Sequence, residues 1–147
     1  MNRIRMIAVV LALFACGAAA GAIEKTSDLV RRDAPKGISE TFYACIDKAD
    51  YGTIAIAACL TAEKHVQDAR LNRSYKALLG KLDGKGREQL VDAERAWLAF
   101  RGKSGGLEST LWGSEIVSNL EVAQRDMFRV CERANTLDDY LSLVSDM

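Results

Sequence analysis

The strongest constraint on the fold is the helical spacing of apolar residues in the chain. Leu90, Ala93, Trp97 and Phe100 recur at offsets of 0, 3, 7 and 10, which puts one apolar stripe on one side of a helix. Other segments carry similar stripes, and no stretch alternates as a strand would. We therefore predict an all-α protein, a small antiparallel bundle of four to five helices. The expected helices cover residues 39–48, 54–82, 87–103, 115–133 and 136–145.

Residues 1–22 have the layout of a secretory signal peptide. Arg3 and Arg5 precede the apolar run IAVVLALFA, and the small residues CGAAAGA follow it. This run is too short to span a bilayer comfortably. We expect export to the bacterial periplasm or envelope. Cleavage after the small residues would release the chain, whereas the LFAC sequence ending at Cys16 would allow lipidation of that cysteine and a membrane anchor. Both readings stay open.

The chain after the leader divides into an arm and one domain. Residues 23–38 are polar and contain the only proline, Pro35, so we interpret them as a flexible N-terminal arm. Residues 39–147 hold all the predicted helices and form the helical domain.

Three cysteines remain after the leader: Cys45, Cys59 and Cys131. In an oxidising compartment an odd number indicates one disulfide and one thiol, or one thiol shared with a partner. Cys45 lies six residues before Tyr51 and Cys59 lies eight after it, so an antiparallel helix pair turning there would bring them together. We predict a Cys45–Cys59 bridge that staples a helical hairpin. Pairing of Cys131 with one of these two is the alternative.

Charge and residue types argue against several function classes. Without Arg3 and Arg5, the 20 basic residues fall to 18 against 20 acidic ones, a formal charge of −2, so nucleic acid is not an expected partner. The only histidine, His65, lies in a charged stretch and is interpreted as a surface side chain. No His/Cys cluster has metal-ligand spacing, and no G-x-S-x-G motif marks a nucleophile. We predict a protein that is not an enzyme, with no cofactor or metal.

Two motifs stand out in the chain, LNxxY at residues 71–75 and LxxAERAWLAFR at residues 90–101. They resemble the domain of LprI-type lysozyme inhibitors. Thr53 with Cys59, and Cys131 with Thr136, match two further spacings of that family. The resemblance covers about residues 42–143. It implies an exported, often lipid-anchored helical protein of a family in which some members inhibit lysozyme.

The chain departs from the family pattern after the second motif. The family continues with Arg-Asp-x-x-Cys, whereas Arg101 is followed here by Gly-Lys-Ser-Gly. The late arginine of the family is replaced by Asp139. We therefore expect a remodelled segment over residues 102–120, and the missing cysteine is consistent with an unpaired Cys131.

The motif residues fall into an apolar and a polar group. We expect the apolar group to form core contacts; its members are Leu71, Tyr75, Leu90, Ala93, Trp97 and Phe100. The polar group consists of Asn72, Arg95 and Arg101. For Asn72 and Arg101 we expect a hydrogen bond or ion pair between helices, with a ligand contact as the alternative.

The function that the resemblance favours is binding and inhibition of a cell-wall-degrading enzyme such as lysozyme. The partner would then be a protein, and contact with a membrane would come only through a lipid anchor. Residues 102–114 and the turn at residues 49–53 are the candidate contact loops. An immunity protein against a secreted effector and a non-catalytic accessory or structural envelope protein are the alternatives.

Overall fold

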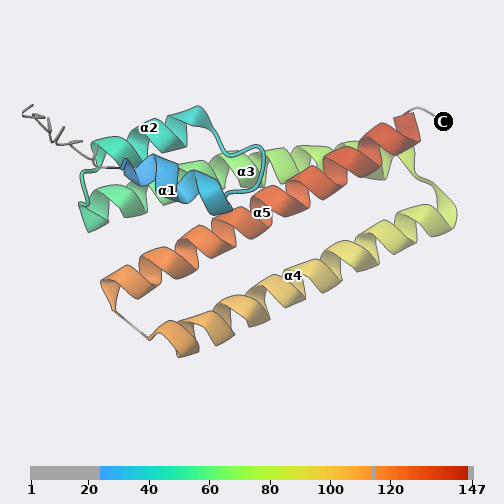
Figure 1. Cartoon of the computed structure of the whole chain (residues 1–147). Coiled ribbons are helices and arrows are strands. Elements are labelled where there is room, and N and C mark those ends of the chain that lie inside the picture. Colours follow the sequence, from blue (N-terminus) through green and yellow to red (C-terminus); the bar gives the residue numbers. More distant parts are fainter. Residues whose placement is uncertain (1–23, 114, 146–147) are drawn as a thin grey trace, which may run out of the picture.

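The computed structural model describes residues 24–113 and 115–145, and its regular elements are helices. These are α1 (Thr26–Asp33), α2 (Glu40–Lys48), α3 (Thr53–Lys81), α4 (Gly84–Trp112) and α5 (Ile116–Ser145) (Figure 1). The predicted all-α class is confirmed. Within the described ranges, no helix is long and apolar enough to cross a membrane. The predicted leader and Cys16 lie outside the described residues.

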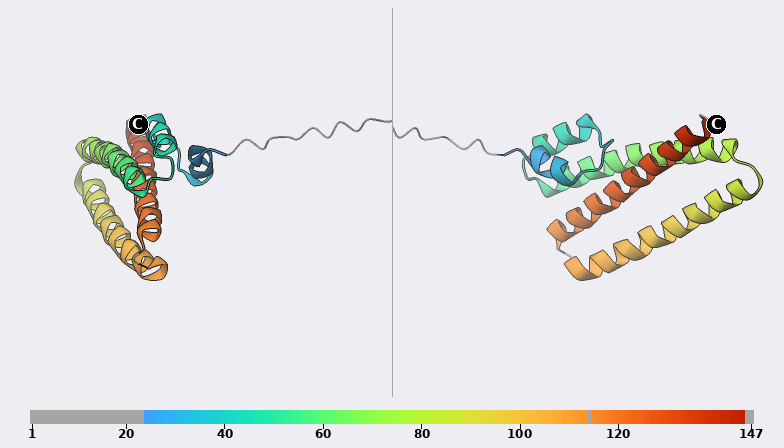
Figure 2. Two further views of the ribbon diagram at one scale, coloured as in Figure 1. Left: turned by 90° about the vertical axis from the view of Figure 1, so that its left-hand side faces the viewer. Right: turned by 45° about the vertical axis from the view of Figure 1, so that its right-hand side comes forward.

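Three long helices form the body of the molecule, and two short ones cover one end of it. α4 runs back antiparallel to α3, and α5 then returns in the direction of α3 (Figures 1 and 2). The contact between α3 and α5 is the most extensive in the structure, and α4 packs chiefly against α5. α1 and α2 lie over the beginning of α3 (Figure 1). The antiparallel bundle therefore contains one parallel pair, α3 and α5.

α5 supplies the central apolar stripe of the core. Five of its side chains are 0 % exposed: Met127, Val130, Cys131, Ala134 and Leu137. Near α2 this stripe meets the aromatic and aliphatic residues Ile38, Phe42, Tyr43, Ile46 and Leu60. Toward the other end it meets Leu71, Leu78 and Leu90. Burial of each large apolar side chain contributes about 1.5–3 kcal/mol, so this stripe is a main source of stability.

The predicted disulfide is confirmed. Cys45 of α2 is bonded to Cys59 of α3, with a Cα–Cα distance of 5.8 Å, and Cys131 is free and buried. The bridge closes a loop over a sequence separation of 14 residues. A loop of this size corresponds to roughly 3 kcal/mol of stabilisation through the entropy of the unfolded chain.

Part of the segment expected to be a flexible arm is a helix packed on the domain. In α1, Ser27 is buried; its backbone N–H and its hydroxyl donate to the two carboxylate oxygens of Asp47 at 2.9 and 2.8 Å. These bonds lower the pKa of Asp47. The Arg31 guanidinium stacks 3.6 Å from the ring centroid of Tyr43. The polar residues that suggested an arm are thus used to dock α1 onto α2.

Two predicted helix ends are wrong. α4 continues through Gly105 and Gly106 to Trp112, although glycine lowers helix propensity. The hydroxyls of Ser109 and Thr110 donate to the carbonyls of these two glycines at 2.9 and 3.1 Å, within an unbroken helix. The expected break near residue 134 is also absent, because Ala134 is a fully buried member of the α5 stripe. Packing overrides local propensity in α5.

Residues 36–39, which connect α1 to α2, are held by polar side chains of α3 and α5. The Lys36 carbonyl accepts from Asn135 Nδ2 at 2.8 Å, and the Gly37 carbonyl accepts from Gln67 Nε2 at 2.9 Å. Ser39 donates its backbone N–H to Glu63 Oε1 at 3.0 Å. We call residues 36–39 the strap, because they tie α2 to both α3 and α5.

The contacts of the strap predict how a methyl group added at Gly37 changes stability. Gly37 has a φ of +104°, and an added Cβ would lie 2.6 Å from Nη1 of Arg70. Arg70 has little freedom to move, since Asn135 and Asp138 hold its guanidinium. We expect Gly37→Ala to lower the free energy of unfolding by at least about 1–3 kcal/mol. Urea denaturation followed by circular dichroism measures this loss.

Gly80→Ala is the matched control for that substitution. A Cβ at Gly80 meets nothing within 4 Å, and the residue lies in α3. Alanine there should raise stability by up to about 1 kcal/mol, because it reduces the entropy of the unfolded chain. Equal effects of the two substitutions would contradict the proposed role of the strap.

Candidate functional site

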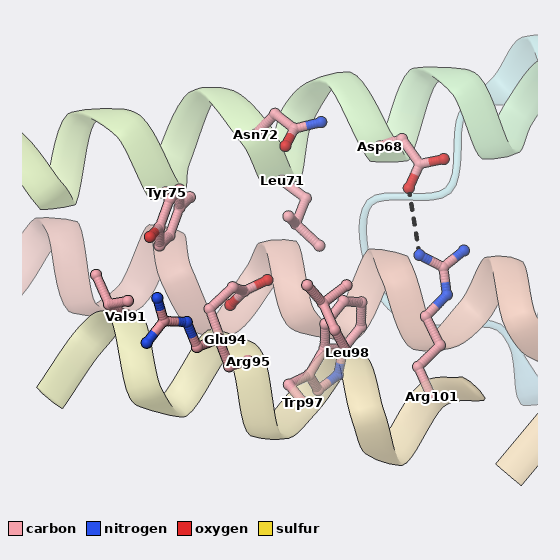
Figure 3. A pocket seen from close by; sticks show the side chains of 10 residues that line it. All are labelled: Asp68, Leu71, Asn72, Tyr75, Val91, Glu94, Arg95, Trp97, Leu98 and Arg101. Carbon is pink, nitrogen blue, oxygen red and sulfur yellow. Dashed lines mark ion pairs between the residues drawn. The ribbon is translucent and has the colours of Figure 1, made fainter. Parts of the chain in front are cut away.

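A groove between α3 and α4 gathers most of the residues of the two sequence motifs (Figure 3). Its volume is about 460 Å³. Its lining side chains are Asp68, Leu71, Asn72, Tyr75, Val91, Glu94, Arg95, Trp97, Leu98 and Arg101. The groove exists because α4 packs on α5 and leaves its α3-facing side open. It combines apolar and aromatic side chains with amide and charged groups, a mixture that ligand sites commonly have.

Arg101 joins the three long helices. Its Nε and Nη2 donate to the two carboxylate oxygens of Asp126 on α5 at 2.6 and 2.8 Å. Its Nη1 lies 3.7 Å from Asp68 of α3, the ion pair drawn in Figure 3. Lys64 Nζ, also from α3, approaches Asp126 Oδ2 at 2.8 Å. The expected ion pair between helices is therefore present at Arg101.

The charges around Asp126 determine its protonation. Burial by itself would raise the pKa of this carboxyl, but hydrogen bonds from Arg101 and Lys64 outweigh it and lower the pKa from 3.8 to about 2. The same interaction raises the pKa of Arg101. Both groups are ionised at neutral pH, so they form a charged pair between α4 and α5.

The other two polar motif residues behave differently from Arg101. Asn72 is exposed in the groove and makes no hydrogen bond to any residue that the structure describes. Arg95 is exposed too, and its one ion-pair partner within the described residues is Asp92 of its own helix, at 3.4 Å. The predicted helix-to-helix bond of Asn72 is therefore not seen, and its amide stays available for a contact from outside.

The apolar motif residues divide between core and surface. Leu71 and Leu90 are buried, and Tyr75 and Trp97 pack against the same cluster. The other two predicted core residues, Ala93 and Phe100, are exposed, Phe100 by 58 %. With 3.6 residues per turn, position 100 lies about 60° around the helix from position 97. Because α4 has one main neighbour, α5, only the Leu90–Trp97 side of the stripe is covered.

A buried polar network on α3 was not identified from the sequence. Glu63 and Gln67 hold the strap, and Arg70 Nε donates to Asp138 Oδ2 of α5 at 2.9 Å. Ser74 also donates to Asp138. The signal was available, because these α3 positions recur every three or four residues on the face that carries Leu60 and Leu71. Polar residues at core spacing indicate a hydrogen-bond network between helices.

The turn between α2 and α3 is exposed and has an unusual backbone conformation. Asp50 and Tyr51 have φ values of 43° and 62°, a conformation that non-glycine residues seldom adopt. Tyr51 is 67 % exposed. The Cys45–Cys59 bridge closes the hairpin around this turn. In the other predicted contact loop, residues 102–114, the part from 102 to 112 is helical, because α4 continues to Trp112.

The single histidine of the chain is the last candidate residue. His65 is exposed, as expected, and has no hydrogen-bond partner among the described residues. Within those residues, no group of three or more His, Cys, Asp or Glu side chains is placed to hold a metal ion.

The comparison with protein families decides which family this fold represents. The family model described as "Lysozyme inhibitor LprI" matches residues 45–137. The chain belongs to the LprI lysozyme inhibitor family. The LprI match begins at the bridged Cys45 and contains the turn, the groove and most of α5, whereas α1 and the strap precede it. No curated protein and no solved structure matches the chain.

The structure agrees with the absence of one cysteine of the LprI pattern. Gly105 occupies the position of the family cysteine, and Cys131 is the one free thiol in the part of the chain that the structure describes. Burial raises the pKa of Cys131, so the thiol stays protonated at neutral pH. In this LprI protein the later cysteine is a core residue.

The Arg101–Asp126 pair predicts a pH-dependent contribution to stability. The folded-state pKa of Asp126, about 2, lies below the ordinary 3.8, so its stabilisation is complete above about pH 4 and disappears as the pH falls toward 2. We expect Asp126→Asn to cost about 1–3 kcal/mol at pH 7. The difference in unfolding free energy between wild type and variant should shrink steadily from pH 4 to pH 2, as measured by urea denaturation.

The control for Asp126→Asn is Asp139→Asn, an exposed carboxylate on the same helix. Asp139 has no ion pair within the described residues, so its replacement should change stability little at any pH. A pH-independent loss for Asp126→Asn would show that its charge is not what joins the helices.

Proposed function

We propose that this protein is exported to the bacterial envelope, with residues 1–22 as its leader, and that it binds and inhibits lysozyme. The LprI family match over residues 45–137 carries this proposal. Inhibition is steric: the helical body presents a rigid surface that blocks the cleft of the enzyme. The protein contributes shape and charge to this contact and no reacting group.

The contact surface that we favour is the turn at residues 49–53. Tyr51 projects from it, and the neighbouring Ile54 is the most exposed of the large apolar side chains. Exposed aromatic residues on a protruding turn are typical anchors of protein interfaces. Backbone strain of the kind seen at Asp50 and Tyr51 persists where the surroundings enforce it, and such sites are often functional.

The rigidity of the turn supports it as the contact surface. The disulfide holds both helices that flank the turn, and the Gly52 N–H donates to the Ala49 carbonyl at 2.7 Å. A preorganised turn loses little conformational entropy when it binds, so more of the contact energy appears as affinity. The turn therefore has the property that an inhibitory element needs.

The acidic side chains at the turn favour a cationic target. Asp47 and Asp50 lie beside the turn, and hydrogen bonds from Ser27 lower the pKa of Asp47. A cationic enzyme surface would be attracted to these carboxylates. The attraction is local, because Lys48 lies between them and the whole chain is nearly neutral. We expect a moderate salt dependence of binding.

The test is a titration of lysozyme activity. The chain is expressed from residue 1, purified in the form that the host makes, and titrated into c-type lysozyme during cell-wall lysis at low and moderate salt. Loss of lysis near a stoichiometric ratio supports the proposal. Full lysis at a large molar excess contradicts it and favours the alternative of an immunity protein with a different cognate effector.

Tyr51→Asn tests the turn as the inhibitory surface. Asparagine tolerates a positive φ, so the substitution removes the aromatic ring and preserves the backbone. We expect inhibition to weaken at least about tenfold, the effect of losing one interface anchor. Tyr140→Asn is the control, because Tyr140 is also exposed, by 47 %, and lies on α5. Equal effects of the two substitutions would exclude the turn.

A further inference from the structure

Four polar groups along the groove between α3 and α4 have no hydrogen-bond partner among the described residues. Three of them are the Asn72 amide, the Tyr75 hydroxyl and the indole N–H of Trp97. The fourth is Oε1 of Glu94, a buried carboxylate whose other oxygen accepts from Arg133 Nε at 2.9 Å. Native proteins leave few polar groups near the interior without partners, so this cluster indicates a site that a ligand completes.

These groups include both donors and acceptors. The indole N–H of Trp97 only donates, and the Glu94 oxygen adds an acceptor. The Asn72 amide and the Tyr75 hydroxyl can do both. A ligand hydroxyl donates one hydrogen and accepts at two lone pairs, so a ligand with several hydroxyl groups matches such a mixed set.

The formal charges along the groove cancel. Its acidic and basic side chains are two carboxylates and two guanidinium groups: Asp68, Glu94, Arg95 and Arg101. Asp68 and Arg101 also form an ion pair at 3.7 Å. An anion or a cation would meet repulsion as well as attraction here, so a neutral polar ligand fits the groove better.

Apolar surface lies among the polar groups of the groove. Leu71, which is buried, and Leu98, which is 52 % exposed, line it together with two aromatic rings. Figure 3 shows Tyr75 at one end of the groove, Arg101 at the other, and Asn72 between them. A pyranose ring has hydroxyls around its edge and C–H groups on its faces. It can therefore cover apolar surface while its hydroxyls bind the polar groups nearby.

The size of the groove selects a short ligand. From Asp68 to Tyr75 it follows α3 for about 10 Å, at 1.5 Å per residue. A helix of a partner protein, about 10 Å wide with its side chains, would need more room than 460 Å³. An extended peptide of this length has about three residues. It presents fewer hydrogen-bonding groups to one side than a short chain of pyranose rings does.

We propose that the groove between α3 and α4 binds a short neutral oligosaccharide. The Asn72 amide, the Tyr75 hydroxyl and the Trp97 indole N–H bind ring hydroxyls, and the C–H faces of the rings cover the apolar surface. This site goes beyond the proposed inhibition of lysozyme and uses another surface, since Thr53 and Asp68 lie about 22 Å apart along α3.

The two tryptophans of the chain, Trp97 and Trp112, provide the test by nuclear magnetic resonance. Trp97 lines the groove, whereas Trp112 is the last residue of α4 and does not. The ¹⁵N-labelled chain, expressed from residue 1 and purified in the form that the host makes, is titrated with cellotriose, chitotriose and maltotriose. The titrations reach about 10 mM, because small polar ligands of open sites bind weakly. Trp112→Phe assigns the two indole signals.

We expect at least one of the three sugars to shift the indole N–H signal of Trp97 saturably and to leave that of Trp112 in place. A trialanine peptide, the control ligand, should shift neither signal. No saturable shift with any sugar, equal shifts of both indoles, or a response to trialanine alone would overturn the proposal.

Matched substitutions locate the sugar in the groove. Asn72→Ala and Tyr75→Phe each remove one hydrogen-bonding group and should weaken binding roughly threefold or more. Gln89→Ala is the control, because Gln89 is an exposed amide of α4 outside the groove. Equal effects of Asn72→Ala and Gln89→Ala would exclude the groove. No enzyme is present in these titrations, so a chain that inhibits lysozyme and binds none of the sugars contradicts the saccharide site alone.

Discussion

The packing of α3 against α5 is the contact on which the other parts of the structure depend. The buried stripe of α5, from Met127 to Leu137, fills the space beside α3. The strap then attaches α2 to both helices, through Gln67 on one and Asn135 on the other. The disulfide adds a covalent link from Cys45 to α3. Each further element is positioned relative to a pair that is already buried.

α4 is held in a different way, mainly by charge. Within its described length the buried residues are Leu90 and Glu94. Glu94 accepts from Arg133 Nε at 2.9 Å, and the Arg101–Asp126 pair makes a second connection to α5. Charged pairs with part of their surface in water stabilise less than their number suggests, because desolvation offsets attraction. α4 is thus an ordered helix with a small apolar contact, and this leaves the groove beside α3 open.

Local patterns in the sequence were sufficient for the helical class, the Cys45–Cys59 bridge and the LprI family. Helical periodicity and cysteine spacing are properties of neighbouring residues, so they can be read without knowing the fold. The same reasoning placed breaks inside α4 and α5, at glycines and polar residues. Those breaks are absent, because packing and helix hydrogen bonds outweigh propensity.

Only the tertiary structure decided which side of α4 is buried. Leu90, Ala93, Trp97 and Phe100 form one apolar stripe in the sequence, but α5 covers Leu90 and Trp97 and leaves Phe100 in solvent. Likewise, the many carboxylates look equivalent along the chain until the fold places Asp126 against Arg101. A sequence fixes the periodicity of a helix, whereas its neighbours determine the direction in which each face points.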